Sequence, residues 1–146
     1  MRAILQRVSE AQVSVGGEVI SSIGRGYLIL LGVTGTDSKT LAETLVDKIA
    51  KLRIFPDENG KSNLSITDID GEILVVSQFT LYADTRKGNR PSFTEAAPPE
   101  LANELYEYFI EYSKTKFNKV AAGSFGANMQ VQLVNDGPYT VILEAN

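Results

Sequence analysis

Residues 26–33 read Gly26-Tyr27-Leu28-Ile29-Leu30-Leu31-Gly32-Val33, an unbroken run of apolar and small side chains. A short apolar run without alternation is typical of a strand that is covered on both faces. We therefore place this run near the centre of a β-sheet. The residues before it predict strands at 2–8, 12–15 and 18–20, with the last two joined as a hairpin at Gly16-Gly17.

The residues after this run predict two helices and further strands. Leucine and isoleucine recur at helical spacing over residues 39–52, which indicates an amphipathic helix. Pro98-Pro99 opens a second helix, since proline fits the first helical turn. The other predicted segments are an excursion with a turn over 53–70, a strand over 72–80, a polar loop over 83–97, a turn at 123–126, a strand over 127–134 and a last strand over 139–143.

This element order predicts an α+β protein with a barrel-like, largely antiparallel β-sheet and two main helices, because strands and helices do not alternate strictly. The chain has 146 residues, of which 43% are hydrophobic. That size and composition suit one ordinary domain, and no linker or repeat divides the chain. We expect a single domain over residues 1–146.

The composition excludes several kinds of chemistry. The chain has neither histidine nor cysteine, so a Ser-His-Asp triad, a disulfide and a histidine-bound metal cannot form. We expect no metal and no cofactor. In a hydrolase, the proton acceptor would then be a carboxylate, a lysine, a tyrosine, water or the substrate itself.

Charge and hydropathy limit the partners. The net charge of −4 argues against broad binding to nucleic acid, which needs many cations, but still allows an enzyme that grips only an RNA end. No apolar run approaches the roughly 20 residues that span a bilayer. The first residues also lack the long apolar stretch of a signal peptide. We expect a cytoplasmic protein without a membrane partner.

Ser77-Gln78-Phe79-Thr80-Leu81-Tyr82-Ala83-Asp84 forms the first candidate motif. An apolar strand runs into hydroxyl and amide groups, and strand ends can present polar groups rigidly to a ligand. Backbone N–H groups there could stabilise the negative oxygen that develops when an ester is attacked. A strand whose polar end merely meets water is the alternative interpretation.

Two further motifs are polar. Asn135-Asp136-Gly137-Pro138 is typical of a turn between two strands, and its proline lacks a backbone donor. The loop around Arg86, Lys87 and Arg90 gathers three cations within five residues of an acidic protein. These cations could meet phosphates near an RNA terminus, or they could simply be solvated.

Taken together, these motifs resemble the D-aminoacyl-tRNA deacylase family. Residues 77–81, 88–93 and 135–138 fall in the order and spacing of that family, and residues 1–8 and 125–129 are similar to it as well. The resemblance runs essentially end to end. One departure is Tyr139, where a smaller residue, commonly valine, is expected, so we expect a packing change there without loss of activity.

The resemblance implies a homodimer with its active site at the interface. Gly137-Pro138 would be a cis pair that reaches into the partner's pocket, and Ser77-Gln78-Phe79-Thr80 would form the opposite wall. Backbone donors near Phe79 and Thr80 would bind the ester, and the neighbouring 2′-hydroxyl of the terminal adenosine would assist the attack. The substrate would be the 3′ end of an aminoacyl-tRNA, with no role for DNA.

The resemblance also implies that chirality is read by exclusion. Carbonyl oxygens of Gly137 and Pro138 would leave no room for an L side chain, whereas D residues and glycine would fit. Arg7 would fix the Gly-Pro conformation, since a guanidinium can bridge carbonyl groups, although an ordinary strand arginine is the alternative. Met129 would join the substrate-binding residues, and Arg86, Lys87 and Arg90 would contact the tRNA.

Two rival hypotheses remain open at this point. The basic loop and the tyrosines would also suit an RNA-binding module without enzymatic activity. Thr80 could instead be the covalent nucleophile of an esterase, although no base stands beside it in sequence and a bare hydroxyl is a weak nucleophile.

Overall fold

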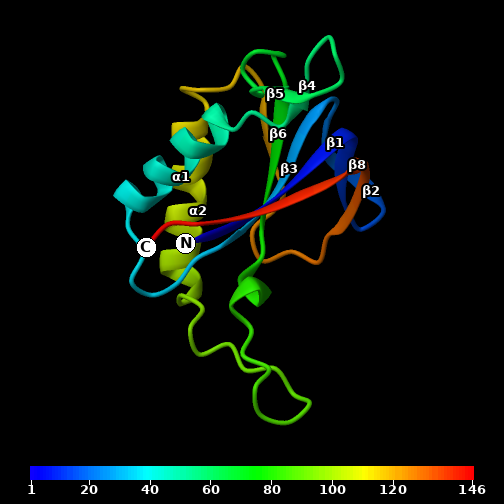
Figure 1. The fold of residues 1–146 in the computed structure, drawn as a ribbon. Coiled ribbons are helices and arrows are strands. Elements are labelled where there is room, and N and C mark those ends of the chain that lie inside the picture. The colour runs from blue at the N-terminus through cyan, green and yellow to red at the C-terminus, as the bar shows by residue number, and fades with distance from the viewer.

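A computed structural model describes residues 1–146 as two helices packed against a strongly curved sheet (Figure 1). The helices are α1 (Lys39–Lys51) and α2 (Pro99–Ser113), and a 3-10 turn, η1, spans Phe79–Tyr82. The strands are β1 (Arg2–Val15), β2 (Glu18–Ile23), β3 (Gly26–Gly32), β4 (Phe55–Pro56), β5 (Ser62–Leu64), β6 (Glu72–Ser77), β7 (Val120–Ala122) and β8 (Gln130–Glu144).

Strand β1 organises the six-stranded sheet, whose order is β2-β1-β3-β6-β7 with β8 also paired to β1. The first half of β1 pairs with β3, its second half pairs with β2, and β8 follows it along nearly its whole length. These three pairings are antiparallel, whereas β3–β6 and β6–β7 are parallel. The predicted α+β class and the barrel-like, largely antiparallel sheet are therefore confirmed.

Several strands end at other residues than the sequence predicts, and the pairing between strands explains the difference. The strands predicted at 2–8 and 12–15 form one strand, because β8 also pairs with β1 between them, at Glu10 and Ala11. The predicted turn at residues 135–138 lies inside β8, which therefore joins the strands predicted at 127–134 and 139–143. The strand predicted over 72–80 ends at Ser77 and gives way to η1.

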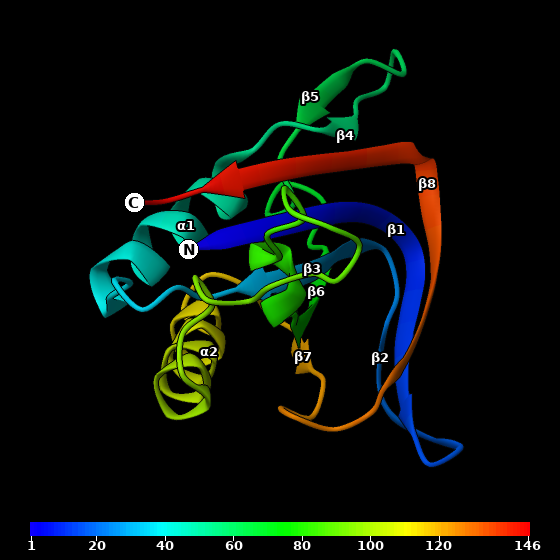
Figure 2. The ribbon, with the colours of Figure 1, turned by 90° about the horizontal axis from the view of Figure 1, so that it is seen from below.

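The helices cover one side of the sheet and bury its main hydrophobic core (Figure 2). Helix α1 begins where Ser38 accepts a hydrogen bond from the Leu41 N–H, as expected of a helix cap. In α2, the Tyr106 hydroxyl donates to the Val75 carbonyl oxygen over 2.9 Å, which ties this helix to β6. Neither helix has the length and apolar character needed to cross a membrane.

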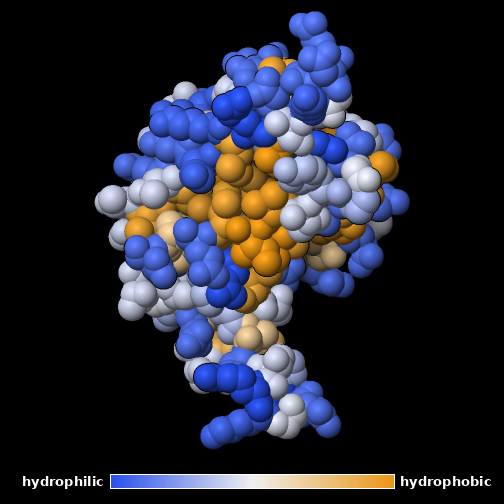
Figure 3. All heavy atoms as spheres, viewed as in Figure 1, coloured by the Kyte–Doolittle hydropathy of each residue, from blue (hydrophilic) through white to orange (hydrophobic).

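A second, smaller core fills the curl of the sheet on the face away from the helices. Next to it, an apolar row crosses three strands, since Ile4 of β1 lies opposite both Ile142 of β8 and Leu30 of β3. Residues directly opposite each other share one face of a sheet. Ile142 is 63% exposed, and Figure 3 shows hydrophobic side chains gathered over the region where β8 and β1 cross.

Candidate active site

The end of β6 carries the first predicted site segment. The Gln78 N–H donates to the Leu31 carbonyl oxygen over 2.8 Å, and the chain then turns into η1. Phe79 is 54% exposed, and its ring meets the edge of the Phe93 ring at 4.9 Å between centroids. Thr80 is also exposed. This segment therefore presents the side chains of Phe79 and Thr80 outward from the end of β6.

The Thr80 hydroxyl has an amide as its polar neighbour. Its oxygen accepts a hydrogen bond from the Gln78 Nε2 over 2.5 Å. An amide cannot take a proton from a hydroxyl, and activation of such a nucleophile needs an adjacent base. The observed partner thus gives Thr80 no means of becoming a strong nucleophile.

The basic loop projects from the body of the protein beyond η1, as Figure 1 shows. Arg86 is held by Asp84 through bonds of 2.9 and 2.7 Å, and this hydrogen bonding lowers the pKa of Asp84 to about 2. Lys87 and Arg90 are exposed and form no ion pair. Two of the three predicted cations are therefore free to meet a phosphate, while the charge of Arg86 is locally balanced.

Gly137 and Pro138 lie in a bulge in the middle of β8. The ladder between β1 and β8 pairs Val8 with Asn135 and then Gln6 with Thr140, so residues 136–139 stand opposite a single residue of β1. Gly137 has a φ of +135°, and the bond to Pro138 is cis. Bulges of this kind turn the backbone out of the sheet and expose its polar groups.

Arg7 holds this bulge from the β1 side. Its Nε donates to the Asp136 carbonyl oxygen over 2.9 Å, and its Nη1 donates to the Ile54 carbonyl oxygen over 2.6 Å. The guanidinium carbon lies 4.7 Å from the centre of the Tyr139 ring, a favourable cation–π contact. Burial raises the pKa of the nearby Tyr27 phenol above its ordinary value, so that group stays neutral.

Asn135 closes the base of the bulge. Its side-chain Nδ2 donates to the carbonyl oxygens of Arg7 and Tyr139 over 2.9 and 3.0 Å. One side chain therefore bridges β1 and the returning half of β8. We call this pair of hydrogen bonds the Asn135 clamp. The sequence motif contains Asn135, but the sequence does not predict that its side-chain amide joins the two strands.

The structure separates the two predicted motifs within one chain. The η1 segment lies beside Arg2, whose Nη1 donates to the Leu81 carbonyl oxygen over 2.6 Å. The Gly137 bulge lies beside Arg7, five residues further along β1. At the rise of an extended strand, this spacing corresponds to about 17 Å. One chain alone does not bring both motifs around one small ester.

Met129 lies near the end of β6, not near Gly137. Its sulfur accepts a contact from the Ser124 N–H at 3.3 Å. A Cβ built on Gly123 would lie 2.7 Å from that sulfur and 3.6 Å from Val76, the residue before Ser77. Met129 therefore belongs to the surroundings of the Ser77-Gln78-Phe79-Thr80 segment.

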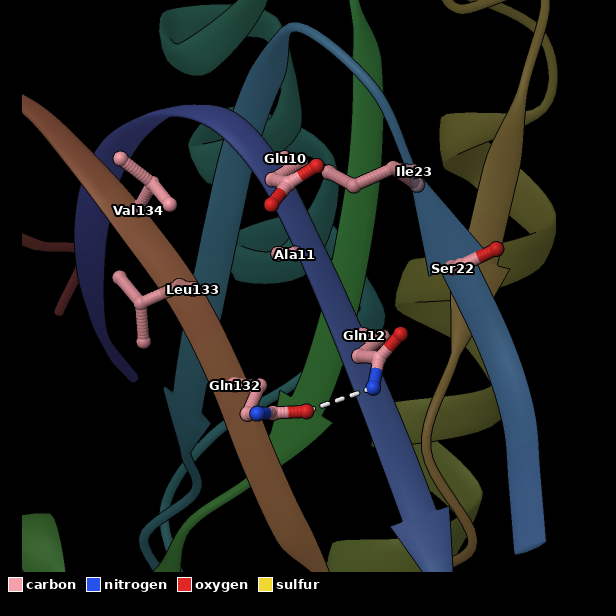
Figure 4. A pocket seen from close by; sticks show the side chains of 8 residues that line it. All are labelled: Glu10, Ala11, Gln12, Ser22, Ile23, Gln132, Leu133 and Val134. Atoms are coloured by element: carbon pink, nitrogen blue, oxygen red, sulfur yellow. Dashed lines mark hydrogen bonds between the residues drawn. The ribbon is translucent and has the colours of Figure 1, made fainter.

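Two hollows of the surface leave out residues 77–80 of the first motif and Gly137-Pro138 of the second, although one of them reaches Tyr82. One, of about 420 Å³, is formed by residues of β1, β2 and β8. Among its lining residues, Gln12 Nε2 donates a hydrogen bond to Gln132 Oε1 over 2.6 Å, which is the dashed line in Figure 4. The other, of about 520 Å³, is lined by Tyr82 and by residues near both chain ends. Neither is lined by residues 77–80 or 137–138.

Comparisons with known proteins identify the family to which this chain is similar. The model of the D-Tyr-tRNA(Tyr) deacylase family matches residues 4–144. A D-aminoacyl-tRNA deacylase of Thermosipho africanus (strain TCF52B) is 55% identical, covering 99% of this chain and 97% of the relative. One of Clostridioides difficile (strain 630) is 54% identical, covering 100% and 98%.

Two solved structures share this fold. A protein described as a c-Myc DNA unwinding element binding protein superposes with a TM-score of 0.95 at 46% identity, covering 100% of this chain and 99% of that one. A probable eukaryotic D-amino acid tRNA deacylase superposes at 0.86 with 15% identity and 97% coverage of both chains, which supports the fold alone.

The fold and these comparisons define a small α+β hydrolase of the deacylase class. The chain belongs to the D-Tyr-tRNA(Tyr) deacylase family, as its sequence motifs predict.

The Asn135 clamp gives a stability prediction. Asn135→Ala removes the two hydrogen bonds that Nδ2 donates and the longer one that Oδ1 accepts from Thr140, so we expect the free energy of unfolding to fall by about 1–2 kcal/mol. Asn128→Ala is the matched control, since that exposed amide makes no side-chain hydrogen bond, and its effect should stay within about 0.5 kcal/mol. Urea denaturation measures both, and equal losses would contradict the clamp.

Proposed function

We propose that this protein hydrolyses the ester between a D-amino acid and the 3′-terminal adenosine of a tRNA, and that residues 1–146 form one domain for this task. Family membership supports the reaction. The single observation that supports the mechanism is that the two motifs are held by Arg2 and Arg7, which lie about 17 Å apart along β1, and each motif offers groups suited to an ester. A site that uses both motifs requires two copies of the chain.

The second copy would dock on the apolar row of Ile142, Ile4 and Leu30. Ile142 is 63% exposed and Ile4 and Leu30 beside it are partly exposed, so this row offers apolar surface to a second copy. Ile142 lies four residues beyond Pro138 on the same strand, so contact there would also carry the bulge towards the other copy. In a two-fold dimer the arrangement is reciprocal, and each copy completes the site of the other.

In this site, the backbone of η1 would bind the ester. Donors at Phe79 and Thr80 would stabilise the negative oxygen that forms on the carbonyl. The neighbouring 2′-hydroxyl of the adenosine would assist the attack, which suits a chain without histidine. An aminoacyl ester is already reactive, and correct positioning can lower the barrier by several kcal/mol.

The bulge would choose between mirror images. Arg7 and Asn135 hold the chain on either side of Gly137 and Pro138, so the carbonyl oxygens of these residues would form a rigid wall. An L side chain would collide with that wall, while a D side chain would point away from it. Glycine has no side chain, so glycine mischarged on tRNA-Ala would also be cleaved.

The tRNA would approach along the projecting loop. Lys87 and Arg90 carry free charges there, and Arg86 adds donors beyond its pair with Asp84. Contacts to phosphates fix position without reading sequence. Because the chain is acidic and has only these few cations near the site, it would bind one end of the RNA and not its whole length. This activity would take place in the cytoplasm.

Two rival functions have weaker support. The DNA-binding description of one solved relative concerns that protein, and the net charge of −4 argues against broad binding to DNA here. A binding module without turnover is disfavoured by the relatives, which are hydrolases by name.

The stereochemical prediction concerns turnover. Purified protein should release D-tyrosine or D-aspartate from tRNA at least about 100 times faster than the matching L-amino acid, because a clash excludes the L side chain. Deacylation of radiolabelled esters measures both rates. Equal rates for the two hands would refute the exclusion model.

A second prediction separates substrate assistance from threonine catalysis. Thr80→Ala should retain kcat within about tenfold, because the Thr80 hydroxyl contacts only the Gln78 amide and lacks a base. A loss above about a thousandfold would assign the chemistry to the Thr80 side chain. Thr85→Ala, in the exposed loop, controls for loss of a surface hydroxyl near the site.

A further inference from the structure

We propose that Arg2 is a positioning residue that fixes η1, and with it the backbone of Phe79 and Thr80, in the orientation that the reaction needs. The role of η1 rests on the proposed function. The contacts of Arg2 do not depend on it and can be tested separately.

Arg2 makes three contacts with its planar head. Its Nη1 donates to the Leu81 carbonyl oxygen over 2.6 Å, and its Nε donates to Glu144 Oε1 over 2.6 Å. Its guanidinium carbon lies 4.8 Å from the centre of the Tyr82 ring. Two of these contacts hold consecutive residues of η1, one through the backbone and one through the ring.

The strand register explains why Arg2 can reach both groups. Arg2 of β1 lies opposite Gly32 of β3 on one side and Glu144 of β8 on the other. The three residues therefore form one row across the sheet, with their side-chain positions on the same face. Residues Leu81 and Tyr82 lie over this row.

Gly32 provides the second support. A Cβ built on Gly32 would lie 3.1 Å from both Leu81 Cβ and a ring carbon of Tyr82. A side chain at this position would therefore force Leu81 and Tyr82 to shift by a few tenths of an ångström. Leu81 and Tyr82 of η1 thus pack closely against Gly32 and are both contacted by Arg2. Phe79 and Thr80 at the start of η1 are exposed.

The role requires arginine in particular. A guanidinium offers donors in a fixed fork and stacks on an aromatic ring, whereas an ammonium is a point charge that cannot do both at once. The ion pair with Glu144 is a minor part of the arrangement, because these side chains are 33% and 48% exposed and surface pairs contribute little. The bond to Leu81 is the contact that orients η1.

The test compares Arg2→Gln with Glu144→Gln. Arg2→Gln should lower kcat for D-aminoacyl-tRNA at least tenfold with KM within about threefold, since small displacements of reacting groups are costly in rate. Glu144→Gln keeps the bond to Leu81 and should stay within about twofold of the unchanged protein in kcat. Arg2→Lys should show an intermediate loss of kcat.

Amide hydrogen exchange supplies a readout that needs no substrate. Exchange in a peptide covering residues 79–83 should accelerate in Arg2→Gln, while exchange in α1 and α2 stays unchanged. Unchanged exchange at 79–83, or equal losses of kcat in Arg2→Gln and Glu144→Gln, would overturn the proposal. If Arg2→Gln does not fold, Arg2→Lys decides, and unchanged kcat and exchange in it would also overturn the proposal.

The two proposals fail separately. An unchanged protein that leaves D-esters intact would refute the proposed function, while the exchange measurement would still decide whether Arg2 holds η1.

Discussion

Strand β1 keeps Arg2 and Arg7 apart, and the rest of the structure depends on the distance between these two residues. Arg2 near one end contacts η1, and Arg7 contacts the β8 bulge. Backbone pairing to β3 and β8 keeps this part of β1 extended, so the two contacts cannot approach each other. A site that needs both motifs must therefore be assembled from two chains, which is the basis of the function proposed here.

Each motif is fixed by an arginine that binds backbone carbonyl oxygens. Arg7 and Asn135 hold the bulge around Gly137, while Arg2 and Gly32 seat η1. Fixed donors and acceptors suit a chain that lacks histidine, since such a chain must rely on position more than on proton transfer. A rigid backbone is also needed to distinguish D- from L-amino acids by steric clash, because a flexible backbone would move aside and admit both enantiomers.

Local sequence patterns predict the fold class and the two motifs, whereas the spatial relation of the motifs is implied only by the resemblance to the family. Apolar periodicity located α1, and the run at residues 26–33 became β3, because burial patterns are local. By itself, the Asn135-Asp136-Gly137-Pro138 motif predicts a turn, since its local chemistry is the same in a turn and in a bulge. Only the pairing with β1 distinguishes the two. The roles of Arg2 and the Asn135 amide depend on long-range contacts that no local pattern encodes.

The most direct test is complementation between two inactive variants. Phe79→Pro removes a backbone donor of η1, and Gly137→Val fills the bulge. If the two motifs meet across a dimer, refolding an equal mixture yields mixed dimers with one intact site each, and about a quarter of normal D-aminoacyl-tRNA hydrolysis returns. No recovery above the sum of the separate variants, in a mixture that demonstrably forms mixed dimers, would contradict a site shared between chains.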